Sequence, residues 1–372
     1  MTTDYRINVA EPFVGEEEAE AVRRVLLSGQ YVSGAKVAEF EKAFAGYIGT
    51  EYAVAVSNGT SALYIALEAM GVGKGDEVIV PPMTFFATVS SVLFLGAKPV
   101  FADLDLDDLC LSPDSVKDKI TPRTKAILPV HLFGAAAKMD RLLAIAERHG
   151  IPILEDCAQA HGTEHQSRKV GGIGRAGAFS FFATKHMTTG EGGMITTNDK
   201  TIVETAKILR SHGMSGRDDH VMLGYNNRMT EMEAAMGLVQ LNKLEELNRK
   251  RIENSEYLLN RVKELSWAHI PVPGENVKHT YFWCPVMVKA NSGKTIDDLK
   301  AHLKEHNIGF RQRYQAPLYK QPVLRQIDPD YANLHLPNVE QVAGQVIGLP
   351  NHPGLQKSDL DRVVQVLTDF IK

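Results

Sequence analysis

Residues 52–102 read YAVAVSNGTSALYIALEAMGVGKGDEVIVPPMTFFATVSSVLFLGAKPVFA, a stretch in which short apolar runs alternate with helical patterns. The apolar runs predict strands at 52–57, 77–80 and 99–102. The segments between them carry apolar residues at helical spacing and predict helices at 60–70 and 84–95. This alternation is typical of a largely parallel sheet with helices on both faces. Ligands bind at the carboxyl ends of the strands in such sheets, so the residues that follow each strand are the candidates for binding and catalysis.

The alternation continues beyond this stretch and then changes character. Further strands are predicted at 126–131 and 151–155, with a helix at 139–149 between them. Helical patterns dominate after about residue 198, at 200–212 and 230–262, and Gly237 is a point where the longer one could bend or break. A strand at 279–288 and helices at 296–306 and 358–370 follow. We predict a large α/β domain at 1–245, including an N-terminal substrate-side segment, and a smaller C-terminal α+β domain at 246–372.

The composition is that of a globular protein of enzyme size. The chain has 372 residues, of which 44% are hydrophobic and 23% charged, and this excludes a disordered, collagen-like or disulfide-scaffold protein. A net charge of −4 gives no basic field for nucleic acid. The N-terminus lacks a secretory pattern, and the least polar stretch, 83–101, is too polar and interrupted to span a bilayer, so we expect a cytoplasmic protein without membrane association. The cysteines and histidines lack metal-ligand spacing, so we expect no metal.

The first chemical feature is the predicted strand–turn–helix junction at 57–63. Gly59 permits a tight turn, and the backbone amides that follow it would point outward at a helix N-terminus. Thr60 and Ser61 add hydroxyls, a combination that suits a phosphate. An ordinary Ser/Thr helix cap uses the same residue types, so the junction alone leaves both interpretations open.

The second feature is the sequence LEDCAQAH at 154–161, which directly follows a predicted buried strand. An ionised Asp156 at that depth requires a cationic partner, because burying an unpaired carboxylate is costly. The aspartate could cap a helix or could hold a protonated ring nitrogen. The spacing does not choose between these roles.

The third feature is AFSFFATKHMTTGEGGM at 178–194, where an aromatic strand-like run ends in Thr-Lys before a glycine-rich turn. A lone lysine at a strand end is usually a solvated surface charge. Lys185 stands between two apolar segments, where desolvation would lower its pKa and leave a nucleophilic amine. A fourth feature, GYNNRMTE at 224–231, opens a helix with two asparagines that could simply cap it.

Taken together, a phosphate seat, an aspartate and a lysine 29 positions later describe binding of pyridoxal phosphate. The chain resembles the DegT/DnrJ/EryC1/StrS family, the sugar aminotransferases with the fold type I of aspartate aminotransferase. The resemblance runs from 29–34 near the start to LPNHP at 349–353 near the end. It implies a mostly parallel sheet between helices plus a smaller C-terminal domain.

The resemblance also implies roles for individual residues. Lys185 resembles the lysine that forms a Schiff base with the cofactor, and Asp156 resembles the partner of the pyridine nitrogen. The cofactor phosphate is implied to lie on four residues, Gly59, Thr60, Ser61 and Ser180. Gln159 matches the residue near the phenolic oxygen, and Phe85 the ring that stacks on the pyridine. Asn226 matches an asparagine that reaches the phosphate of the neighbouring subunit's cofactor, which implies a homodimer with shared active sites.

The predicted substrate pocket includes three departures from the family pattern. His186 stands where relatives often have Asn, Asn227 where many are aromatic, and Tyr319 where many have His. The substrate candidates are His186, Arg228, Arg311, Arg313, Tyr314 and Tyr319. If the substrate carries a diphosphate, the arginines among them are the groups that would meet its charge.

By resemblance, the protein transfers an amino group from L-glutamate, releasing 2-oxoglutarate, to a nucleotide-linked keto-deoxysugar. The loop at 188–193 is similar to that of members that make a 4-amino sugar of the perosamine type. The alternatives within the family are a sugar 3-dehydratase, in which His replaces the lysine, and a cyclitol aminotransferase. A non-catalytic regulatory relative is the alternative outside enzymes, but the intact Lys185 and Asp156 argue against it.

One competing motif points to a nicotinamide oxidoreductase. The sequence GIGRAG at 172–177 satisfies the dinucleotide-binding pattern G-x-G-x-x-G. That fingerprint requires a strand before it and a helix after it, whereas a polar stretch precedes this one and a strand-like run follows. We therefore interpret it as a set of glycine-rich turns.

Overall fold

The computed structural model describes residues 5–32 and 34–371. Its large domain contains a seven-stranded sheet, because two parallel bridges, Ile127 to Ile153 and Val130 to Asp156, join two smaller sheets. The strand order is β1 (Tyr52–Val56), β9 (Gly193–Thr197), β8 (Ala176–Ser180), β5 (Leu154–Asp156), β4 (Thr124–Ile127), β2 (Glu77–Val80) and β3 (Lys98–Phe101). Only β9 runs antiparallel to its neighbours in this sheet of the described residues. The α/β class with a largely parallel sheet is confirmed.

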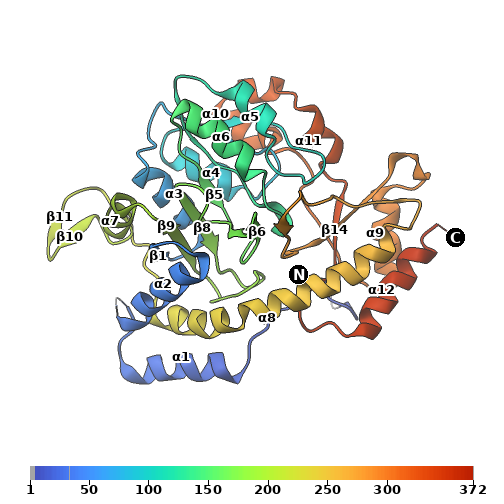
Figure 1. The fold of residues 1–372 in the computed structure, drawn as a ribbon, viewed down its shortest axis with the longest axis horizontal. Helices are drawn as coiled ribbons and strands as arrows, with labels where there is room; N and C mark the ends of the chain where they lie inside the picture. Colours follow the sequence, from blue (N-terminus) through green and yellow to red (C-terminus); the bar gives the residue numbers. More distant parts are fainter. Residues whose placement is uncertain (1–4, 33, 372) are drawn as a thin grey trace.

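Helices cover this sheet (Figure 1). Every residue of β5, β8 and β9 is buried, as expected for strands covered on both faces. The helices of the large domain are α1 (Glu16–Ser28), α2 (Ala35–Ile48), α3 (Gly59–Ala69), α4 (Ala87–Phe94), α5 (Pro113–Lys119), α6 (Met139–His149) and α7 (Lys200–Leu209). Shorter strands lie outside the main sheet at β6 (Glu164–His165), β7 (Arg168–Lys169), β10 (Met214–Gly216) and β11 (Asp219–His220).

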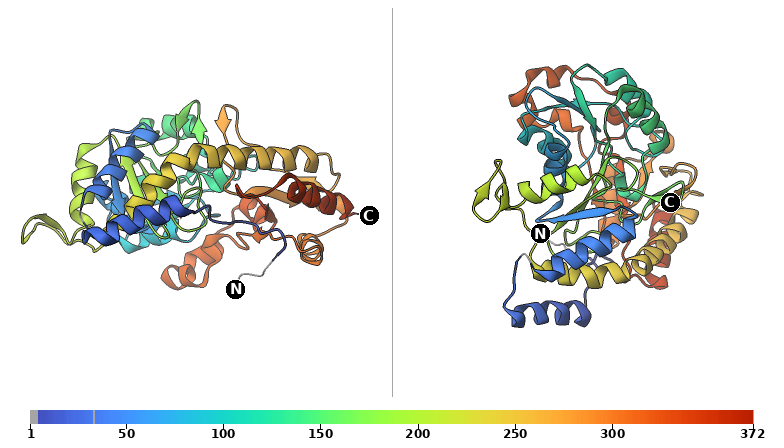
Figure 2. Two further views of the ribbon diagram at one scale, coloured as in Figure 1. Left: turned by 90° about the horizontal axis from the view of Figure 1, so that it is seen from below. Right: turned by 60° about the vertical axis from the view of Figure 1, so that its left-hand side comes forward.

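The long helix α8 (Glu231–Val262) connects the large domain to the C-terminal part (Figures 1 and 2). Thr230 caps it by accepting a hydrogen bond from the Glu233 amide, and the Glu233 carboxylate accepts one from the Thr230 amide. The helix is unbroken at Gly237, where a Cβ atom would lie 2.7 Å from the Phe40 ring. The glycine at position 237 is therefore explained by its close packing against Phe40, because the helix does not break there. The predicted boundary at residue 245 falls inside α8 and stays a prediction.

The C-terminal part has a four-stranded antiparallel sheet of its own. Its strand order is β12 (Ala268–His269), β14 (Cys284–Val288), β16 (Val346–Leu349) and β15 (Arg311–Gln312). Helices α9 (Ile296–Glu305) and α12 (Lys357–Asp369) pack with it around a second hydrophobic core that includes Trp267, Val286 and Leu367. A further strand, β13 (Val277–Lys278), pairs with β6 of the large domain.

One C-terminal segment returns to the large domain. The short helices α10 (Pro322–Ile327) and α11 (Pro337–Val342) lie near the top of Figure 1, and the segment that carries them contacts β3 and the residues after it. Tyr331 donates a hydrogen bond to the Pro99 carbonyl oxygen at 2.6 Å, and the Val339 amide donates to Asp103 at 2.9 Å. The substrate candidate Tyr319 belongs to this segment, which explains its position described below.

The strand predicted at 279–288 is shorter in the structure. The observed strand begins only at Cys284, because Tyr281 adopts a positive φ of 48° that interrupts an extended chain. Among the described residues, no helix is long and apolar enough to cross a membrane.

Candidate active site

A cavity of about 720 Å³ opens at the carboxyl ends of β5 and β8 and at the start of α3. Eleven of the predicted site residues line it: Gly59, Thr60, Ser61, Phe85, Asp156, Gln159, Ser180, Lys185, Arg311, Arg313 and Tyr314. They come from loops and strand ends that are far apart in sequence. This is where a doubly wound sheet is expected to place a ligand.

One end of the cavity has the features of an anion seat. Asn58 caps α3, because its Oδ1 atom accepts a hydrogen bond from the Ser61 amide at 2.8 Å. The capping role therefore does not fall to Thr60 or Ser61, which lie in the first helical turn beside amides that have no partner within the helix. A Cβ atom on Gly59 would lie 2.6 Å from the Cβ of Ser180. Only glycine lets the helix start approach the end of β8 this closely.

Lys185 lies partly buried in the same cavity. Its Nζ atom is 4.7 Å from the centroid of the Phe282 ring. The pKa of Lys185 is lowered to about 8: desolvation is the largest cause, the charges of Arg313 and Arg311 act in the same direction, and the charge of Asp156 opposes them. A far larger fraction of this amine is therefore uncharged near neutral pH than for an ordinary lysine.

Asp156 ends β5 and is 4% exposed. Its Oδ1 atom accepts a hydrogen bond from the Ala158 amide at 3.1 Å, and its Oδ2 atom accepts one from the Thr88 hydroxyl at 2.9 Å. Burial raises the pKa of Asp156, whereas these two hydrogen bonds and the charge of Lys185 act against the rise. The carboxylate is thus held in one orientation in an environment that is largely inaccessible to water.

Gln159 connects the cavity to two neighbouring aromatic residues, Phe133 and Tyr314. Its Oε1 atom accepts a hydrogen bond from the Phe133 amide at 3.0 Å, and its Nε2 atom donates to the Tyr314 hydroxyl at 3.1 Å. The Phe133 ring stacks on Trp283, with centroids 5.0 Å apart and planes at 15°. Burial raises the pKa of Tyr314 to about 12, so its hydroxyl is neutral near pH 7.

Arg311 and Arg313 supply positive charge at the cavity. Arg311 lies in β15 and is half-buried, and Arg313 follows the strand and is exposed. Among the described residues, no carboxylate forms an ion pair with either guanidinium. Burial and the charge of Arg313 lower the pKa of Arg311. These two cations are therefore available to an anionic ligand.

Four predicted residues lie outside this cavity. His186 is buried behind it, with its ring centroid 5.6 Å from that of Phe282, and burial lowers its pKa well below the usual value. Tyr319 is buried against the large domain and donates to Glu340 at 2.8 Å. Arg228 lines a separate cavity of about 250 Å³ with Glu41 and Arg210. Asn226 is exposed and does not line the cavity; its backbone forms an isolated antiparallel β-bridge with Ser211.

The sequence predictions missed several residues that line the cavity: Tyr64, Thr84, Thr88, Phe282 and Trp283. Thr84 and Thr88 left a signal, since they are polar residues four positions apart at the start of an apolar segment. Asn227 was predicted only as a departure from the family pattern. It lines the cavity, accepts a hydrogen bond from Ser57 at 3.3 Å and donates one to the Tyr64 hydroxyl.

The glycine-rich turns at 171–174 bind an internal carboxylate. The fully buried Glu155 accepts hydrogen bonds from the amides of Gly171, Ile173 and Gly174 at 2.9, 2.8 and 2.7 Å, and pairs with His131 at 3.0 Å. Burial raises the pKa of Glu155, but these bonds outweigh it and the net shift is downward. The amides of this glycine-rich turn therefore bind a carboxylate of the protein itself, and β8 follows the turn instead of the helix that a dinucleotide site requires.

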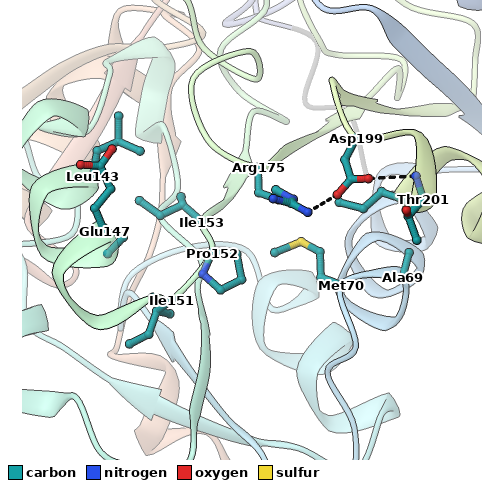
Figure 3. A pocket seen from close by; sticks show the side chains of 13 residues that line it. Ala69, Met70, Leu143, Glu147, Ile151, Pro152, Ile153, Arg175, Asp199 and Thr201 are labelled. Atoms are coloured by element: carbon teal, nitrogen blue, oxygen red, sulfur yellow. Dashed lines mark hydrogen bonds and ion pairs between the residues drawn. The ribbon is translucent and has the colours of Figure 1, made fainter.

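A second cavity, of about 650 Å³, lies near the amino ends of β5 and β8 (Figure 3). Its wall combines apolar side chains such as Met70 and Ile153 with an ion pair between Arg175 and Asp199. Asp199 also caps α7 by accepting a hydrogen bond from the Thr201 amide at 2.8 Å. The Arg175 and Asp199 charges here are paired with each other, and none of the predicted site residues lines this cavity.

The sequence profile of the DegT/DnrJ/EryC1/StrS aminotransferase family matches residues 12–368. The chain belongs to this family. The family resemblance predicted from the sequence is thus confirmed over nearly the whole chain.

Individual relatives agree with this membership. The chain is 36% identical to the spore coat polysaccharide biosynthesis protein SpsC of Bacillus subtilis, over 97% of this chain and 96% of SpsC. The crystal structure of DesV from S. venezuelae is 35% identical over 96% of this chain and 95% of its own, with a TM-score of 0.91. The putative sugar aminotransferase Spr1654 from Streptococcus pneumoniae, solved in a PLP form, is 28% identical over 99% of both chains, with a TM-score of 0.91.

The protein is therefore a pyridoxal-phosphate-dependent sugar aminotransferase. The cavity fits this cofactor. It offers a helix N-terminus and a serine hydroxyl for a phosphate, a buried carboxylate for a ring nitrogen, and an amine of lowered pKa for an aldehyde.

Proposed function

We propose that this aminotransferase moves an amino group from L-glutamate to a nucleotide-linked keto-deoxysugar, and in particular to a 4-keto sugar of the perosamine type. The observation that supports an anionic, nucleotide-linked acceptor is the pair of arginines without carboxylate partners, Arg311 and Arg313, beside Lys185. A dicarboxylic donor and a diphosphate acceptor both carry negative charge that such a pair binds. The loop at 188–193 supports the perosamine type by its similarity to members that make 4-amino sugars.

The proposed roles of the catalytic residues follow from their positions. Bound pyridoxal phosphate supplies an electron sink for the carbon that loses or gains a proton. Lys185 binds the cofactor and, when its amine is free, takes a proton from one carbon and returns it to another as a tethered base and acid. Asp156 holds a proton at the ring nitrogen, and the α3 N-terminus with Ser180 holds the phosphate.

Arginine replacements should weaken substrate binding. We expect Arg311→Ala and Arg313→Ala each to raise the KM for donor or acceptor about 10- to 100-fold, the range for losing one hydrogen bond to a charged group. The kcat should change less, because neither arginine is proposed to move a proton. Steady-state kinetics with each substrate varied in turn measures this. Arg325→Ala is the matched control, because Arg325 is exposed on α10 and donates to the Lys320 carbonyl oxygen; an equal effect there would contradict the assignment.

A substrate panel tests the proposed reaction. Purified holoenzyme is supplied with glutamate and with nucleotide-linked 3-keto and 4-keto deoxysugars, and the products are weighed by mass spectrometry. An aminated 4-keto sugar supports the proposal, whereas amination of 3-keto sugars only would reject the perosamine assignment. Activity only on unlinked cyclitols would replace the acceptor class. Loss of a sugar hydroxyl without amination would identify a dehydratase, an outcome that the presence of Lys185 disfavours.

We also propose that the protein is a homodimer with shared active sites, in which Asn226 serves the partner's cofactor. The β10–β11 hairpin supports this, because it projects from the body of the chain in two views (Figures 1 and 2). The segment that follows it presents Val221 and Leu223, whose exposed fractions are 51% and 94%. Apolar side chains this exposed, on a projecting element, are typical of a surface that another subunit covers.

Leu223→Asp should shift the protein from dimer to monomer, because a carboxylate would have to be buried without a partner in the interface. Light scattering after size-exclusion chromatography measures the mass. Val272→Asp is the control, since Val272 is 63% exposed in the C-terminal part, away from the hairpin. A wild-type mass of one subunit would reject the dimer, and a Leu223→Asp mass of two subunits would reject the role of the hairpin.

A further inference from the structure

Two threonines form a chain of hydroxyls that ends on Asp156. The Thr88 hydroxyl donates to Asp156 Oδ2 at 2.9 Å, and the Thr84 and Thr88 hydroxyl oxygens lie 3.2 Å apart. Thr84 is 1% exposed and Thr88 0% exposed, and both line the active-site cavity. Neither residue was among those predicted to act in the site.

The charge of Asp156 fixes the direction of this chain. An ionised carboxylate can only accept hydrogen bonds, so the single proton of Thr88 must point to Asp156. The Thr88 oxygen is then free to accept from Thr84, and the two donors run in one direction toward the negative charge. Hydrogen bonds aligned in this way strengthen one another in a low-dielectric interior.

The opposite side of the carboxylate is also held. The Ala158 amide donates to Oδ1 at 3.1 Å, so each carboxylate oxygen has one protein donor. The groups of charge or possible charge that act on Asp156 are Lys185 in the cavity and His131 behind the strand. The Thr88 hydroxyl is therefore the side-chain donor that binds this carboxylate directly in the described structure, and it comes from a different element, α4.

We propose that Thr88 is a positioning residue that keeps Asp156 ionised and in one orientation, and that Thr84 supports it by donating to Thr88. This inference rests on the proposed role of Asp156 as the partner of the cofactor's ring nitrogen. Without the Thr88 donor, the buried carboxylate loses about half of its hydrogen bonding to protein groups. Its protonated form then gains relative to the charged form, and the attraction for a protonated ring nitrogen falls.

The test compares the affinity of purified variants for pyridoxal phosphate, followed by the absorbance of the bound cofactor on titration. Thr88→Val removes the hydroxyl at nearly constant shape, and we expect it to weaken binding about 10-fold or more, the effect of losing one hydrogen bond to a charged group. Thr88→Ser keeps the donor and should restore nearly wild-type affinity. Thr84→Val should weaken binding by less than Thr88→Val does.

Two further variants separate this inference from the rest. Ser91→Ala is the control, because Ser91 is fully buried in the same helix but donates to the Thr88 carbonyl oxygen at 3.0 Å. If Ser91→Ala weakened binding as much as Thr88→Val, the effect would be a general one on α4 and the proposal would fail. Asp156→Asn is the reference: weak binding there with wild-type affinity in Thr88→Val overturns only the role of Thr88. Wild-type affinity in both variants would overturn the proposed role of Asp156 as well.

Discussion

Replacing Lys185 with alanine is expected to abolish transamination almost completely, with kcat falling at least about 10³-fold. The reason is that this one amine has two proposed tasks, holding the cofactor by a covalent bond and moving the proton. Its lowered pKa of about 8 makes the uncharged, nucleophilic form accessible near neutral pH. Single-turnover kinetics and the visible absorbance of the bound cofactor measure both tasks.

Two further variants make the Lys185 prediction specific. Lys185→Arg keeps the positive charge but provides no amine of suitable pKa, so it should be as inactive as Lys185→Ala. Lys169→Ala is the matched control, because Lys169 lies outside the cavity with its Nζ atom 4.6 Å from the Tyr47 ring centroid. Activity of Lys185→Ala within about tenfold of wild type would show that another residue moves the proton.

Most of the predicted cofactor residues lie together in one cavity, and their grouping could be predicted because strand ends carry strong local signals. Asp156 and Ser180 end two buried strands, and parallel strands of one sheet place such residues at the same edge. The glycine at position 59 was predictable for a similar reason, since it directly follows a strand and opens a helix. The local sequence was sufficient to predict residues such as these, which lie directly at the end of a strand or at the start of a helix.

The positions of the substrate candidates were harder to predict, because tertiary packing determines which of them reach the cavity. Lys185 and His186 are neighbours in sequence, yet only Lys185 lines the cavity and His186 is buried behind it. Tyr319 lies in a segment that returns to the large domain, where Phe101 packs on it at a ring-centroid distance of 5.7 Å. No local sequence pattern predicts that this segment packs against the large domain, because the packing depends on contacts between residues more than 200 positions apart.

Two of the aromatic residues that line the cavity were also missed by the sequence-based prediction. Phe282 and Trp283 line the cavity, but in sequence they belong to a run that predicts an ordinary strand. Both residues come before the first residue of the observed strand, Cys284, and Tyr281 before them has a positive φ. A sequence pattern does not predict a positive φ at a tyrosine, because this residue type rarely adopts it, so the first part of the predicted strand could not be recognised as part of the cavity.

Replacing Asp156 with asparagine is expected to lower kcat about 10²- to 10³-fold, the range for loss of one preorganised electrostatic group. The side chain keeps its shape, and its amide oxygen can still accept from Thr88 or Ala158. What it loses is the negative charge that would keep a proton on the ring nitrogen and let the cofactor accept electrons. Folding should be little affected, because a neutral amide is easier to bury than a carboxylate whose pKa burial already raises.

Asp108→Asn is the matched control for Asp156→Asn. Asp108 is also a buried carboxyl, 4% exposed, and burial raises its pKa to about 6, but it lies outside the cavity. It should therefore tolerate the same substitution with nearly unchanged kcat. Stopped-flow measurement of the half-reaction with glutamate distinguishes the two variants, since only the loss of charge at Asp156 acts on the proton transfer. Equal rates for both variants would mean that the ring nitrogen needs no anionic partner in this enzyme.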